Sequence, residues 1–158
     1  MPTSNRVFVS HIHEDDEHIA NMKTLLKDRG HEVQVSAVDS TSPNNATNEA
    51  YIKSEILAPK IDWASGGAMV VLISPQTKNS HWVDWEIEYA QKVGMRIVGV
   101  WTHGAAECDV PEGLTQYADA VVGWHADQIE GAISGTINNW TGSDGAPKDR
   151  QKIRQFGC

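Results

Sequence analysis

Basic side chains and cysteines are scarce in this chain. Of its 158 residues, 13 are Lys or Arg and 21 are Asp or Glu, which gives a formal net charge of −8. A protein this acidic lacks the positive surface that binds nucleic acid, and it repels an anionic membrane. The two cysteines, Cys108 and Cys158, are too few for a disulfide framework. We therefore expect neither nucleic acid nor membrane as a partner.

Long apolar stretches are also missing. The longest apolar run is Ala68–Ile73, far short of the roughly 20 residues that a membrane-spanning helix needs. The first five residues are polar and lead at once into a strand-like run, so we expect no signal peptide. These features predict a cytoplasmic protein.

Several well-known catalytic and phosphate-binding motifs do not occur. The sequence has no G-x-G-x-x-G or Walker A phosphate loop and no G-x-S-x-G nucleophile elbow. Ser74 and Pro75 follow the apolar run where a phosphoacceptor receiver domain would carry an aspartate. Residues 11–16 (HIHEDD) nearly match the metal-binding run of metallo-β-lactamase-like hydrolases, but Asp16 replaces its last histidine. We therefore expect no metal site, and any nucleotide must be held by other loops.

Strand-like and helix-like segments alternate along the chain. Apolar runs predict strands, which are Arg6–Ser10, 31–38, Ala68–Ile73, Arg96–Trp101 and 118–122. Apolar residues at helical spacing predict the intervening helices, which cover 14–29, 49–57 ending at Pro59, 80–93 and 126–140. Polar segments at 39–48 and 107–115 predict loops.

This alternation favours an α/β fold, a flavodoxin-like doubly wound parallel sheet of five strands in the order 2-1-3-4-5. Residues 1–142 are predicted to form the domain, and 143–158 a tail with four basic and two acidic side chains. Ligands of such folds bind beyond the carboxyl ends of the strands, where the strand order reverses. Ser10, His11, Asp39 and the start of the helix after Ser80 should meet there.

Trp82 and Glu86 are the most informative pair near that edge. They are four residues apart, so on a helix they lie one above the other, beside the apolar stripe of Val83 and Ile87. A carboxylate held against an indole can face a cationic or electron-poor ligand. The spacing fits equally a partly buried Trp beside a solvated Glu.

Trp85 and Tyr89 lie roughly opposite the apolar stripe of Val83 and Ile87 on the same predicted helix. Two interpretations remain open for this aromatic pair. If the rings are exposed, they mark an interface with another protein. If they are covered, they pack against a neighbouring helix.

Taken together, these residues resemble a TIR domain. Residues 7–11 (VFVSH) with Glu14 and Asp15 are similar to the opening TIR box, and 39–48 stand where TIR domains carry the loop after strand two. Ser80, Trp82 and Glu86 resemble the catalytic motif of NAD-consuming TIR domains. Residues 82–90 and 97–100 look most like the TIR-like ThsB subunits of bacterial Thoeris anti-phage defence. The resemblance covers about residues 6–140.

The resemblance implies an enzyme that cleaves the nicotinamide–ribose bond of NAD and makes a cyclic ADP-ribose-type signal for a separate effector. It implies Glu86 as the catalytic carboxylate, with Trp82, Ser10, His11 and Asp39 lining the substrate site. NAD would be the substrate rather than a cofactor, and the protein would self-associate into a homo-oligomer. Whether the product is linear or cyclic stays open.

Two other functions fit the same residues. One is a catalytically silent TIR adaptor that works through Trp85, Tyr89 and loop contacts. The other is an enzyme similar to nucleoside deoxyribosyltransferases, which also use a glutamate on this type of fold. An assay with both NAD and a nucleoside separates the two enzymes.

Overall fold

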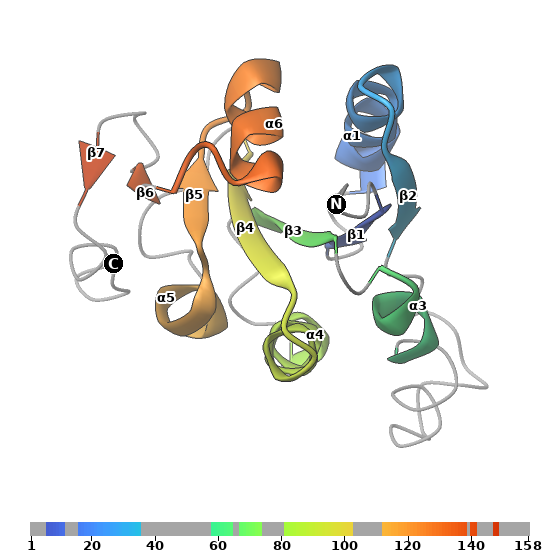
Figure 1. The fold of residues 1–158 in the computed structure, drawn as a ribbon, viewed down its shortest axis with the longest axis vertical. Coiled ribbons are helices and arrows are strands. Elements are labelled where there is room, and N and C mark those ends of the chain that lie inside the picture. Colours follow the sequence, from blue (N-terminus) through green and yellow to red (C-terminus); the bar gives the residue numbers. More distant parts are fainter. Residues whose placement is uncertain are drawn as a thin grey trace.

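A parallel sheet forms the middle layer of the protein in the computed structural model (Figure 1). The structure describes residues 6–11, 16–35, 58–64, 67–73, 81–102, 112–138, 140–141 and 147–148. Within these residues the sheet has seven strands in the order β2-β1-β3-β4-β5-β6-β7. The strands are β1 (Arg6–Ser10), β2 (Glu32–Val35), β3 (Ala68–Ile73), β4 (Arg96–Trp101), β5 (Ala120–Val122), β6 (Trp140–Thr141) and β7 (Pro147–Lys148).

The predicted strand order is confirmed from β2 to β5. Six strands run parallel, and only β7 pairs antiparallel, with β6, among the residues described. Strand β3 lies in the middle and is buried along its whole length. Its sequence (AMVVLI) is apolar on both faces because helices cover both sides of a parallel sheet.

Helices cover the two faces of the sheet (Figure 1). On one face, α1 (Asp16–Asp28) and α6 (Ala126–Ser134) bury residues such as Met22 and Ile129 against the sheet. On the other face lie α3 (Ala58–Trp63), α4 (His81–Lys92) and α5 (Glu112–Tyr117). None of the described helices is long and apolar enough to cross a membrane.

Glycines end the two long helices where the sequence predicts. Gly30 and Gly94 follow α1 and α4 with φ angles of 87° and 79°. Only glycine adopts this left-handed conformation without steric cost, so the helix stops and the chain turns back to the sheet. Strand β2 then begins at Glu32, and β4 at Arg96.

Pro59 lies within a described helix. It is the second residue of α3, which runs on to Trp63. A proline is tolerated there because the first N–H groups of a helix have no partner within the helix. The predicted helix at 49–57 and loop at 39–48 lie outside the described residues, as does Ser80.

The end of the predicted loop at 107–115 is helical instead. Helix α5 begins at Glu112, and Leu114 is completely buried beneath it. The loop prediction rested on Pro111 and Gly113, but the apolar side chain of Leu114 draws this turn onto the sheet. Residues 107–111 lie outside the described part of the chain.

The last helix is shorter than predicted. Helix α6 ends at Ser134 because Gly135 caps it with a φ of 94°, and Trp140 belongs to strand β6 rather than to a helix. Strand β7 lies within 143–158 and pairs with β6, so the sheet extends into the segment predicted as a tail. The boundary at residue 142 stays a prediction.

Candidate functional site

Ser10 ends strand β1 on the face of the sheet that α4 covers. Side chains alternate along a strand, so Ser10 shares a face with Phe8, which is buried in the cluster beneath α4. Ser10 pairs with Val71, whereas β3 continues to Ile73. The first strand therefore stops two residues short of its neighbour, at the reversal of strand order between β1 and β3.

Glu86 reaches the same point from helix α4. Val83, Ile87 and Ala90 of this helix are fully buried in the cluster against the sheet. The neighbouring Glu86 is also buried, and the exposed fraction of its side chain is 0%. The Ser10 hydroxyl donates a hydrogen bond of 2.6 Å to Glu86 Oε1. Our prediction that Glu86 lies close to Ser10 at the carboxyl edge of the sheet is confirmed.

The burial of Glu86 is unusual for its residue type. The buried polar side chains among the described residues are Ser10, Glu86, Thr102 and Thr141, so Glu86 is the one carboxylate in this group. Removing a carboxylate from water is costly unless hydrogen bonds stabilise it. Buried ionisable side chains cluster at functional sites. The Ser10–Glu86 pair is therefore the strongest candidate for a catalytic site among the described residues.

The other predicted site residues are located only in part. His11 directly follows Ser10 and is half-buried. Trp82 belongs to α4, one turn before Glu86, but its side chain is outside the described part of the structure, and so is Asp39. The structure therefore brings Ser10, His11 and Glu86 to one edge, and the roles of Trp82 and Asp39 stay predictions. No cluster of three metal-ligating side chains occurs among the described residues.

Comparison with protein families shows which family this sequence matches. Residues 8–107 match the model of the Thoeris protein ThsB, TIR-like domain. The chain belongs to this family. The matched range contains every residue of the predicted site, from Ser10 to Glu86. The resemblance seen in the sequence is confirmed, and membership supports a role in Thoeris anti-phage defence.

A solved structure shows a similar fold at low sequence identity. A 2-deoxyribosyltransferase from Bacillus psychrosaccharolyticus has a TM-score of 0.60 and 15% identity, over 91% of this chain and 99% of its own. A response regulator from Burkholderia pseudomallei has a TM-score of 0.45 and 15% identity, over 81% of this chain and 66% of its own. A search of curated proteins gave no significant match.

Trp85 and Tyr89 of the TIR-like domain form a stacked aromatic pair on α4. Their rings stack with centroids 5.2 Å apart and an interplanar angle of 22°. Both are half-buried and pack against the core cluster, and the Tyr89 hydroxyl donates a 2.8 Å hydrogen bond to Asp62 of α3. Tyr89 therefore contacts a neighbouring helix, as the second of our two interpretations states, and an interface with another protein through the half-exposed rings stays a prediction.

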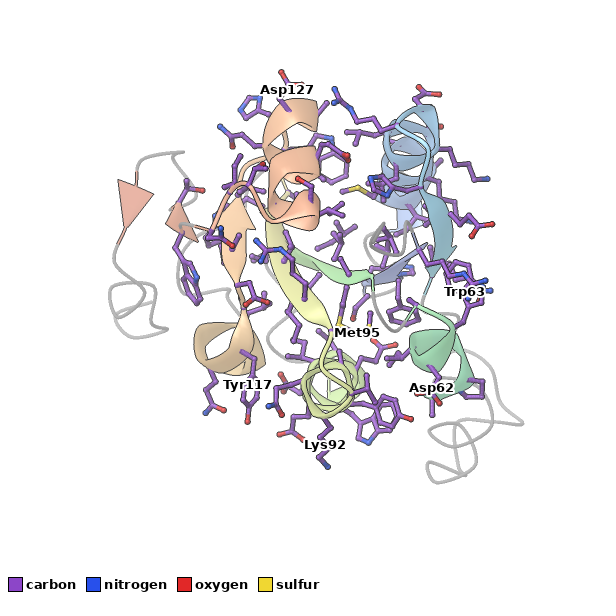
Figure 2. All side chains as sticks on the ribbon, viewed as in Figure 1. Asp62, Trp63, Lys92, Met95, Tyr117 and Asp127 are labelled. Carbon is purple, nitrogen blue, oxygen red and sulfur yellow. The ribbon has the colours of Figure 1, made fainter. Side chains whose placement is uncertain are left out.

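Asp62 is the residue that the sequence did not reveal. It is exposed, and it lies in α3 beyond the proline at which we ended the predicted helix. Nothing in the spacing of residues 58–63 indicates a partner 27 residues further along the chain. Figure 2 shows Asp62 and Trp63 on α3, with Trp63 nearer the sheet.

The Tyr89–Asp62 hydrogen bond makes a prediction for alkaline pH. The hydrogen bond to Asp62 raises the pKa of Tyr89 above its ordinary value of 10.0, with burial and the negative charge of Asp62 adding to the rise. The stability from this bond is therefore complete below the unfolded pKa and is lost as pH rises through the higher folded pKa. Tyrosinate absorbance of the wild type minus that of Tyr89→Phe should titrate above pH 10.0.

Two aspartate variants control this titration. Asp62→Asn should move the Tyr89 midpoint part of the way back toward 10.0, because the negative charge is gone while an acceptor for the hydrogen bond remains. Asp127→Asn on the opposite face should leave the midpoint in place, since Asp127 bonds to Arg29. A Tyr89 midpoint at 10.0 in the wild type would contradict the hydrogen bond.

Ser10→Ala should destabilise the TIR-like domain even without substrate. The change removes a hydroxyl donor from a fully buried carboxylate. Removing one partner of such a bond costs about 1–3 kcal/mol. Urea unfolding should show this loss, whereas Ser134→Ala, at an exposed hydroxyl of α6, should stay within about 0.5 kcal/mol of the wild type. Equal effects of the two variants would contradict the buried bond.

Proposed function

We propose that this TIR-like domain cleaves the nicotinamide–ribose bond of NAD and converts the remainder into a cyclic ADP-ribose-type signal for Thoeris defence. One observation carries the proposal. Glu86 is a completely buried carboxylate, held by a 2.6 Å hydrogen bond from Ser10, at the edge where open parallel sheets bind ligands.

A carboxylate in this position suits the chemistry of the bond. Nicotinamide leaves NAD as a neutral ring, so its departure needs no strong general acid. The bonding electrons go with the ring, and the ribose gains the positive charge of an oxocarbenium-like ion. A preorganised negative charge close to that ion lowers the energy of the transition state, as it does in glycosidases. In this proposal Glu86 supplies that charge from its buried position beneath α4.

Ser10 has a supporting role in this mechanism. Its hydroxyl occupies Glu86 Oε1 and fixes the direction of the carboxylate, so that less reorganisation is needed when the ribose becomes charged. His11 follows at the end of β1 and, with Trp82 and Asp39, is proposed to line the substrate site. Trp82 would offer a ring face on which a ring of NAD stacks.

The fate of the ribose distinguishes two products. Water adds its hydroxyl to the ribose carbon in hydrolysis and releases a proton. In cyclisation, a hydroxyl of the adenosine end attacks the same carbon and loses its proton, which requires a folded substrate and a dry site. We propose the cyclic product, with a separate effector as its receiver. We also propose that a homo-oligomer completes the site.

A direct assay tests the proposal. The purified protein is incubated with NAD, with and without lysate from phage-infected cells, and nicotinamide and nucleotide products are separated by chromatography. We expect free nicotinamide and a cyclic ADP-ribose-type nucleotide in at least one of the two conditions. A deoxynucleoside with a second base is tested in parallel.

The outcomes separate the three functions. Base exchange on the nucleoside without cleavage of NAD would instead support a transferase. Binding to a protein partner with no turnover of either substrate would support a silent adaptor.

A further inference from the structure

Helix α3 contacts both elements that carry the Ser10–Glu86 pair. At the start of β1, Arg6 Nη1 donates a 3.1 Å hydrogen bond to the Trp63 carbonyl oxygen. The Arg6 guanidinium also lies over the Trp63 ring, 5.1 Å from its centroid, which is within cation–π range. The amino end of β1 is thus attached to α3, four residues before Ser10.

The next residue back along α3 is attached to α4. Asp62 accepts the 2.8 Å hydrogen bond from the Tyr89 hydroxyl, and Tyr89 stacks on Trp85. Trp63, Trp85 and Tyr89 all pack against the core cluster that lies under α4. Figure 1 shows α3 and α4 on the same face of the sheet.

The α4 residues that make these contacts lie on either side of Glu86 in the sequence of the helix. Trp85 is the residue before Glu86, and Tyr89 lies three residues after it, on a neighbouring part of the helix surface. Any rotation of α4 about its axis that separates Tyr89 from Asp62 also moves the Glu86 carboxylate relative to Ser10. The two hydrogen bonds, Ser10–Glu86 and Asp62–Tyr89, therefore constrain the same rotation.

Apolar packing alone leaves this rotation weakly determined. Val83, Ile87 and Ala90 hold α4 on the sheet, but the hydrophobic effect has no direction and tolerates small rotations. Hydrogen bonds specify direction, because they weaken steeply as their geometry is distorted. The hydrogen bond that Tyr89 donates to Asp62 is such a directional contact between α4 and the neighbouring helix α3.

We propose that α3 is a strut that sets the distance and rotation of α4 relative to β1, with Asp62 and Tyr89 as positioning residues for Glu86. The catalytic consequence of this strut rests on the proposed function, whereas its effect on the Ser10–Glu86 geometry does not. Asp62 is exposed, and in this proposal it acts through the hydrogen bond that it accepts from Tyr89.

Kinetics of Asp62 variants test the catalytic consequence. Misplacing a reacting group by about 1 Å can cost on the order of 10²-fold in rate, so we expect Asp62→Ala to lower kcat about tenfold with little change in KM. Asp62→Asn retains an acceptor oxygen for Tyr89 and should restore most of kcat. Asp127→Ala is the matched control, because Asp127 is an exposed aspartate whose bond to Arg29 lies on the opposite face (Figure 2).

An unfolding experiment tests the strut independently of NAD. Free energies of unfolding are measured in urea for the wild type, Asp62→Ala, Ser10→Ala and the double variant. Distant sites without shared partners are additive, so coupling through α3 should change the unfolding constant of the double variant more than about threefold from additivity. The same cycle with Asp127→Ala in place of Asp62→Ala should be additive.

The two experiments separate the possible failures. If the wild type does not cleave NAD but the cycle with Ser10 is coupled, the proposed function fails and the strut stands. An additive cycle overturns the strut whatever the activity. Equal kcat values for Asp62→Ala and Asp127→Ala in an enzyme that cleaves NAD also overturn it.

Discussion

Glu86→Gln is expected to lower nicotinamide release from NAD by about a hundred- to a thousandfold, the usual cost of removing one preorganised electrostatic contact. Glutamine has nearly the size of glutamate and its amide oxygen can still accept the bond from Ser10. The change therefore removes the negative charge while it keeps the buried hydrogen bond of 2.6 Å available. The loss should appear in kcat, since the charge is needed as the ribose becomes cationic.

Glu88→Gln provides the matched control for this prediction. Glu88 lies on the same helix but is exposed, since two residues turn the side chain about 200° around the helix axis. Its removal should leave turnover close to the wild type. Thermal unfolding of both variants should remain cooperative with similar midpoints. Near-normal turnover of Glu86→Gln, or an inactive Glu88→Gln, would disprove the catalytic assignment.

Buried strands were the part of the fold that the sequence predicted best. The observed bounds of β1, β3 and β4 equal the predicted ones because each is an apolar run bounded by polar or turn residues. Gly30 and Gly94 likewise predicted where the neighbouring helices end, since their left-handed conformation belongs to glycine. Local sequence is sufficient where a single residue or a continuous run decides the structure.

Elements decided by distant packing were predicted poorly. Pro59 and Gly113 indicate breaks when read locally, yet α3 and α5 form around them because Ile61 and Leu114 are completely buried. Local turn signals are weak where an apolar side chain can reach the core. Strand β6 was missed for a similar reason, because Trp140 completes the far side of the same cluster.

In the candidate site, too, some residues could be predicted from local sequence and others could not. The spacing of Trp82 and Glu86, together with the family resemblance, singled out Glu86, and the expected sheet order brought Ser10 to it. No local pattern marks Asp62, because its significance depends on Tyr89, 27 residues away on another helix. The spacing of a candidate catalytic carboxylate can be recognised in the sequence, whereas the contact of Asp62 is visible only in the structure.

Leu114→Ala should be among the most destabilising single changes outside the site. Leu114 is completely buried beneath α5 and fills the space above Gly99 of β4, where a Cβ would lie 3.2 Å from Leu114 Cδ1. Removing a buried leucine costs transfer free energy and leaves a cavity, together about 2–5 kcal/mol. Urea unfolding followed by tryptophan fluorescence should show the midpoint fall with an unchanged slope.

Leu25→Ala is the control for that loss because it makes the same chemical change at a half-buried position of α1 on the other face. Folding removes less apolar surface from water at Leu25 than at Leu114, so the destabilisation should be clearly smaller. If residues 112–115 formed the exposed loop that their proline and glycine neighbours indicate, Leu114→Ala would change the free energy of unfolding by less than about 0.5 kcal/mol. The difference in the free energy of unfolding between the two leucine variants thus measures how much the packing of α5 on the core contributes to stability.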